Sequence, residues 1–111
     1  METKVTNFRH CDLVKVKGRV DSSTAPQFNK ALQNITDQGH FKLVLDLGEV
    51  DFISSAGLRV LINTQKTCKR YNRGEAVLAN VPANIFAALD LSGFTTLFQL
   101  FDDVTGAVGN F

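Results

Sequence analysis

The residues from Phe41 to Leu61 read FKLVLDLGEVDFISSAGLRVL and carry the signals of a buried strand followed by a helix. The nearly continuous apolar run over 41–47 is typical of a central strand covered on both faces of a sheet. A helical pattern follows from Ala56 to about Tyr71, because apolar or inward-facing residues recur at steps of three and four. Its stripe consists of Leu58, Leu61, Ile62, Gln65 and Cys68. Two adjacent serines, Ser54 and Ser55, stand at the expected start of this helix.

Upstream of this unit, the sequence predicts a hairpin and a first helix. A short strand over Lys4–Phe8 pairs with an alternating strand over 13–20. The buried face of the second strand is formed by alternate residues, Val14, Val16 and Val20. Thr24 is expected to cap the next helix, with Gln27 three residues later completing a capping box, and Gly39 is expected to end it. The apolar stripe of this helix is Phe28, Leu32 and Ile35.

Downstream, strands and helices continue to alternate. We expect a strand over 76–79, a helix over Pro82–Leu91, a last strand over Thr96–Leu100 and a short final helix over Val104–Val108 capped by Asp102. The inward face of the helix over Pro82–Leu91 is expected to be Ile85, Phe86 and Leu89. These spacings fit right-handed crossovers between parallel strands. The sequence therefore predicts an α/β fold with a mixed, mostly parallel sheet that opens with a hairpin and has helices packed against it.

Composition narrows the class of protein. The chain has 111 residues, of which 44% are hydrophobic and 21% charged, with a formal net charge of +1, so residues 1–111 are expected to form one globular domain. The balanced charge argues against direct nucleic-acid binding, and no segment approaches the ~20 apolar residues of a membrane span. The N-terminus lacks the apolar core of a signal peptide, which favours a cytoplasmic protein. Cys11 and Cys68 are expected to be buried, reduced thiols, with no metal site and no cofactor.

Several roles are open for the two serines. Ser55 is a candidate helix cap, a position where serine stabilises by ~1 kcal/mol. A hydrolase nucleophile would need a G-x-S-x-G elbow with catalytic partners, and a phosphate cradle would need more glycine and a lysine; both are absent, so we expect no enzyme activity. A modification site is the fourth role. Acidic residues at Asp46, Glu49, Asp51 and Asp21 surround the serines in our interpretation, so a phosphate would add negative charge and repel a partner.

The segment Phe52–Leu61, together with GRVD at 18–21, LVLDL at 43–47 and LSGF at 91–94, resembles the STAS domain of bacterial anti-sigma factor antagonists. The resemblance covers nearly the whole chain. It implies a protein that binds an anti-sigma factor serine kinase, releases a sigma factor, and is switched off when that kinase phosphorylates a serine before the second helix. A serine phosphatase reverses the modification. By motif position, Ser55 matches the phosphoacceptor.

Two departures from the family pattern affect the site. Ser54 stands where the family often has aspartate, which makes Ser54 a second candidate for phosphorylation, and Ala56 replaces a serine or threonine. The surface expected to contact the partner is Asp21, Ser22, Ser54, Ser55, Gly57 and Arg59. Asp21 matches an acidic residue that the family keeps near the phosphoacceptor. The alternative is an unphosphorylated STAS scaffold in another complex, such as a lipid-transport or stress-sensing assembly.

Overall fold

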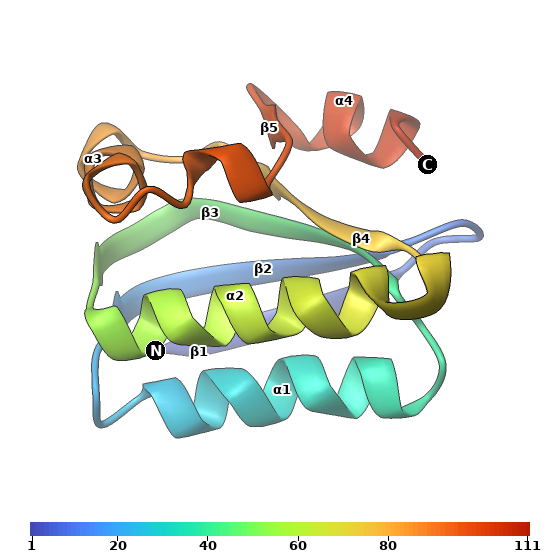
Figure 1. The fold of residues 1–111 in the computed structure, drawn as a ribbon, viewed down its shortest axis with the longest axis horizontal. Helices are drawn as coiled ribbons and strands as arrows, with labels where there is room; N and C mark the ends of the chain where they lie inside the picture. Colours follow the sequence, from blue (N-terminus) through green and yellow to red (C-terminus); the bar gives the residue numbers. More distant parts are fainter.

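A five-stranded sheet in the order β1-β2-β3-β4-β5 forms the centre of the computed structural model, which describes residues 1–111 (Figure 1). The strands are β1 (Glu2–Asn7), β2 (Asp12–Val20), β3 (Lys42–Ile53), β4 (Glu75–Ala79) and β5 (Leu100–Phe101). The pair β1 and β2 is antiparallel, whereas all later neighbours are parallel. The predicted α/β architecture, a mostly parallel sheet that opens with a hairpin, is confirmed.

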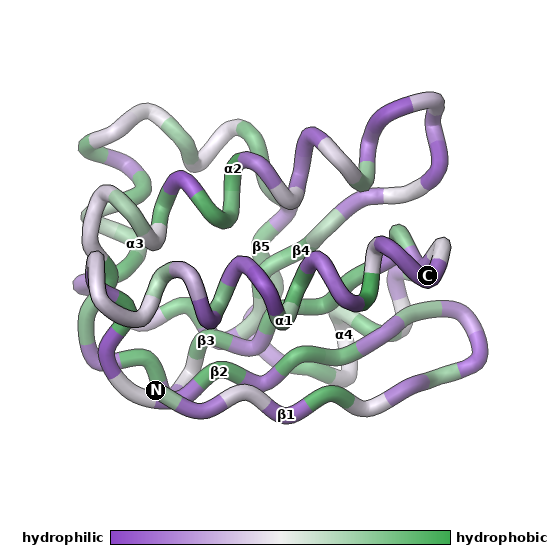
Figure 2. Tube along the Cα trace, turned by 90° about the horizontal axis from the view of Figure 1, so that it is seen from below, coloured by the Kyte–Doolittle hydropathy of each residue, from purple (hydrophilic) through white to green (hydrophobic).

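Four α-helices connect or follow the strands: α1 (Ala25–Asp37), α2 (Ser55–Lys69), α3 (Ala83–Leu91) and α4 (Val104–Gly109). Short 3₁₀ turns follow α2 and α3, at η1 (Arg70–Asn72) and η2 (Thr95–Leu97). Helices α1 and α2 lie side by side along the sheet in Figure 1, and they are in direct contact. Hydrophobic and hydrophilic residues alternate along both of these helices in Figure 2, as amphipathic helices on a sheet require.

The core has a larger and a smaller part, one on each face of β3. Leu43, Leu45 and Leu47 are fully buried in the larger cluster, which also holds the inward residues of α1, α2 and α3. Val44 points the other way and packs with Ala107 of α4 in the smaller cluster. Burying each such leucine stabilises the fold by about 2 kcal/mol. The prediction that this strand is covered on both faces is confirmed.

The ends of α1 confirm one expectation and contradict another. Gly39 adopts a positive φ of 84° and donates its N–H to the carbonyl of Thr36, and the N–H of His40 donates to the carbonyl of Ile35. This is the Schellman arrangement that ends a helix. Thr24 is the N-terminal flanking residue, but its side chain caps no helical N–H. Its hydroxyl instead accepts the N–H of Asp21 at 2.9 Å, so the predicted capping box was wrong.

The C-terminal third departs from the predicted boundaries. The segment predicted as a strand over Thr96–Leu100 is largely the turn η2, and β5 contains two residues. Phe86 is 43% exposed although its neighbours Ile85 and Leu89 are buried as predicted. Asp103, and not Asp102, caps α4, because its carboxylate accepts the N–H of Gly106 at 2.7 Å. For the last strand and the last cap the local signal was present, but its position shifted by one to a few residues.

Two further features are the state of the cysteines and the character of the helices. Cys11 and Cys68 are both buried and unpaired, and burial raises the pKa of the Cys68 thiol to about 11. No helix in the structure combines the length and the apolar character needed to cross a lipid bilayer.

Candidate functional site

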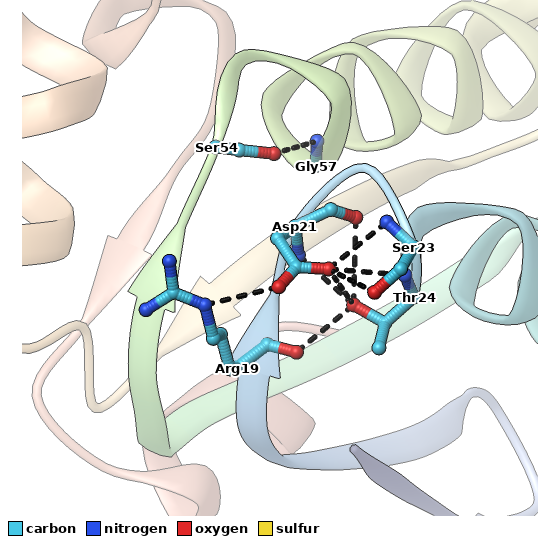
Figure 3. A network of polar contacts seen from close by, with 6 residues as sticks. All are labelled: Arg19, Asp21, Ser23, Thr24, Ser54 and Gly57. Carbon is cyan, nitrogen blue, oxygen red and sulfur yellow. Dashed lines mark hydrogen bonds and ion pairs between the residues drawn. The ribbon is translucent and has the colours of Figure 1, made fainter.

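The turn after β2 and the turn after β3 meet at one edge of the sheet. The N–H of Ser54 donates to the carbonyl of Val20 at 2.8 Å, which ties the end of β3 to the end of β2. Figure 3 shows the loop of Asp21 to Thr24 beside the start of α2. The structure therefore brings together residues that are more than thirty positions apart in the chain.

The two serines have different roles at the start of α2. Ser54 is extended, with φ −90° and ψ 175°, and its Oγ accepts the N–H of Gly57 at 3.3 Å (Figure 3). Its carbonyl accepts the first helical hydrogen bond, from Leu58. Ser55 is the first helical residue; its side chain is exposed and its hydroxyl forms no hydrogen bond within the chain. Ser54 is therefore the helix cap, and the interpretation of Ser55 as the cap was wrong.

Gly57 allows α2 to approach the sheet closely. A Cβ at this position would lie 2.7 Å from Cγ1 of Ile53 and 2.8 Å from Cγ1 of Val20, closer than carbon atoms pack. Both neighbours are β-branched and have little rotamer freedom to move away. Gly57 is buried and therefore lies beneath the surface. We had expected it to contact the partner together with Asp21, Ser22 and Arg59.

Asp21 holds the loop after β2 in shape through a dense set of contacts. Its Oδ1 accepts the hydroxyl of Ser23 at 2.6 Å and the N–H groups of Ser23 and Thr24 at 3.0 and 3.2 Å. Its Oδ2 pairs with Nε of Arg19 at 3.0 Å (Figure 3). The Ser23 hydroxyl, ahead of these N–H groups and Arg19, lowers the pKa of the Asp21 carboxyl to about 2. Asp21 is thus ionised and fully engaged at neutral pH.

The acidic surroundings that we expected for the serines are largely absent. Asp46 lies eight residues before Ser54 on β3, roughly 26 Å along an extended strand. Its carboxylate accepts the side-chain amide of Asn80 at 3.2 Å. Glu49 is paired with Lys15 at 3.4 Å. The charge beside the helix start is therefore that of Asp21, which Arg19 offsets, and of the exposed Asp51.

An open groove of about 470 Å³ runs along α2 from Ser55 toward the C-terminal end of the helix. Its walls include Ser55, Arg59, Ile62 and Lys66 on α2 and Ser92 and Phe94 after α3. The α2 residues follow one another at helical spacing, a signal that the sequence contains. The contribution of Ser92 and Phe94 depends on how the segment after α3 folds back, so sequence reasoning missed this groove.

Comparison with known proteins identifies the family. The family model of the STAS domain matches residues 4–107. A Bordetella bronchiseptica protein named as an anti-sigma factor antagonist, BtrV, is 34% identical over 96 residues, which is 86% of this chain and 82% of the relative. A crystal structure of a Thermotoga maritima protein, described as an anti-sigma factor antagonist, has the same fold (TM-score 0.90, 18% identity, 97% of this chain and 92% of that chain).

The anti-sigma factor antagonist SpoIIAA shares the fold in two forms. Its unphosphorylated form gives a TM-score of 0.83 at 12% identity, over 98% of this chain and 95% of that chain. The phosphorylated form, from Bacillus, gives 0.77 at 13% identity, over 98% of both chains. The family match spans nearly all of the sheet and its helices, including both turns of the site. This chain belongs to the STAS domain family.

Proposed function

We propose that this protein is an anti-sigma factor antagonist that binds an anti-sigma factor serine kinase in the cytoplasm and so releases a sigma factor. The kinase ends the interaction by transferring the γ-phosphoryl group of ATP to Oγ of Ser55, with release of ADP and a proton. A serine phosphatase restores the active form by hydrolysis to inorganic phosphate. Family membership and the relative BtrV support the regulatory role. The observation that carries the choice of Ser55 is its exposed, unbonded hydroxyl, in contrast to the engaged hydroxyl of Ser54.

The position of Ser55 suits a removable phosphate. The first N–H groups of a helix have no carbonyl four residues earlier to bind, and the helix dipole favours negative charge there by ~0.3–1 kcal/mol. Ser55 and Ala56 supply such N–H groups, while that of Gly57 is bound by Ser54. A phosphate on Ser55 therefore leaves the cap intact. The phosphorylated form of SpoIIAA shares the fold of this chain, which supports the proposal that such a fold can carry a phosphate.

The exposed surface around Ser55 is the proposed contact with the kinase. Ser22, Ser55 and Arg59 are exposed, and Asp21 is half-buried. A phosphate adds about −1.5 to −2 charges at neutral pH in the middle of this surface. It changes both the charge and the shape that a partner meets, without any need for a catalytic group in this chain.

The modification can be tested on protein isolated from its own cells. Cleavage after lysine and arginine releases Leu43–Arg59, in which Ser54 and Ser55 are the only residues with a hydroxyl group. Mass spectrometry of this peptide should find one phosphate in wild type and in Ser54→Ala, and none in Ser55→Ala. Absence of phosphate from this peptide under every growth condition, with binding unaffected by Ser55→Asp, would instead support the unphosphorylated scaffold.

The partner can be tested by affinity purification of the same variants. Wild type and Ser55→Ala should retain a protein with an ATP-binding kinase domain, identified by mass spectrometry, and Ser55→Asp should lose it. Ser54→Ala is the matched control, since it removes a neighbouring hydroxyl without adding charge. Equal retention of the kinase by Ser55→Ala and Ser55→Asp would contradict the proposed switch.

A further inference from the structure

The groove along α2 carries positive charge that is not paired within the chain. Arg59 and Lys66 both line it, both are exposed, and neither forms an ion pair. No acidic residue lines the groove. The acidic groups beside the helix start lie outside the groove: Asp21 is held by Arg19, and Asp51 is exposed near the end of β3. Asp90, near the end of α3, is also exposed and outside the groove. A negative group on Ser55 would therefore face a groove whose charged side chains, Arg59 and Lys66, are both cations.

Arg59 is the cation best placed to bind a phosphate on Ser55. The two residues are four apart in α2, so they are neighbours on one helix face with Cβ atoms about 5–6 Å apart. Side chains on a helix lean toward its N-terminus, which directs Arg59 toward Ser55. A guanidinium binds phosphate oxygens through two parallel N–H donors, which a single ammonium does not. Lys66 is eleven residues beyond Ser55, about three turns away along the helix.

We infer that a phosphate on Ser55 binds Arg59 of the same helix, and that phosphorylation acts by occupying Arg59, which in the unmodified protein is free to bind a carboxylate of the partner. This inference rests on the proposed phosphorylation of Ser55 for its biological use. The pairing itself depends only on the geometry of α2. It replaces our sequence-based expectation that the phosphate adds to an already negative surface.

The pairing can be measured without the kinase. Protein carrying phosphoserine at position 55, made by semisynthesis, is titrated by phosphorus NMR to obtain the second pKa of the phosphate, ordinarily near ~6. An Arg59 partner favours the dianion, so this pKa should be lower in the Arg59 protein than in Arg59→Gln by about half a unit. Lys66→Gln is the matched control: it removes a charge from the same groove and should leave the pKa within about 0.1 unit of that of the Arg59 protein. Equal pKa values in the Arg59 protein and Arg59→Gln would overturn the inference.

The consequence for binding is tested with the kinase captured as described above. Arg59→Gln should weaken binding by itself, and phosphoserine at position 55 should weaken it much less in Arg59→Gln than in the Arg59 protein. Fully additive losses would overturn the claim that the phosphate acts through Arg59. A lowered phosphate pKa in a chain that is never phosphorylated in cells would leave the pairing intact and refute the proposed function. Equal pKa values in a chain that is phosphorylated in cells would refute the pairing and leave the proposed function intact.

Discussion

Replacing Ser54 by alanine should destabilise the domain, whereas the same change at Ser55 should not. Ser54→Ala removes the acceptor of the Gly57 N–H, which lies 3.3 Å away in a buried stretch of backbone. Loss of a serine cap costs ~1 kcal/mol on average, and an N–H left without an acceptor adds to that cost when water does not reach it. Because this hydrogen bond is long, we expect the loss of stability in Ser54→Ala to be about 1 kcal/mol and not the ~2 kcal/mol of the strongest caps. Ser55 has no hydrogen bond to lose, so Ser55→Ala should change stability by less than ~0.5 kcal/mol.

Urea unfolding followed by circular dichroism distinguishes the two variants. With a slope of ~2 kcal/mol per molar urea, ~1 kcal/mol lowers the unfolding midpoint by about 0.5 M, and the corresponding fall in Tm is about 4 °C. Ser54→Gly is a useful control because glycine at a cap costs only a few tenths of a kcal/mol. A loss of stability in Ser55→Ala equal to or larger than that in Ser54→Ala would refute the assignment of the cap to Ser54, and with it the reason for treating Ser55 as the free hydroxyl.

Three other changes test the structure around the site. Gly57→Ala should destabilise by about 1–3 kcal/mol in thermal unfolding, since its Cβ meets Val20 and Ile53, and adding Val20→Ala should recover part of the loss. The pKa of Asp21 is lowered to about 2, so its contribution to stability is complete above pH ~4 and is lost as pH falls toward 2; urea midpoints of wild type and Asp21→Asn should converge over that range. Gln65→Leu should cost about 3 kcal/mol or more in urea unfolding, because this buried side chain satisfies the N–H and the carbonyl of Ala76 on β4 and the carbonyl of Leu97 at the end of η2.

The periodic segments of the sequence were sufficient to predict the architecture. The apolar run at 41–47 and the helical stripe after Ala56 each have one dominant period, and tertiary packing in the structure agrees with both. The alternation of Val14, Val16 and Val20 likewise identified the face of β2 that packs under the helices. Where local preference and global packing agree in this way, the pattern alone determines which residues are buried.

Prediction failed where a short polar side chain had a choice of partners. Thr24 fits the capping-box pattern, yet its hydroxyl bonds back to the turn, where it accepts the N–H of Asp21 and donates to the carbonyl of Arg19. Asp102 and Asp103 are adjacent and chemically equal, and only the backbone path after β5 decides which of them reaches the N–H of Gly106. Such choices differ by about 1 kcal/mol or less, so the fold as a whole settles them.

The same one-residue ambiguity decides which of the two serines has a free hydroxyl. β3 continues past the apolar run to Ile53 because its end is paired with Val20, and this fixes Ser54 as the extended residue before the helix. An extended residue at that point directs its Oγ back to the N–H of Gly57, while the next residue is helical and presents its Oγ to solvent. Had the strand ended one residue later, Ser55 would be the cap and its oxygen would be engaged. The register between β2 and β3 therefore decides which hydroxyl is free, and it places that hydroxyl one helical turn before Arg59.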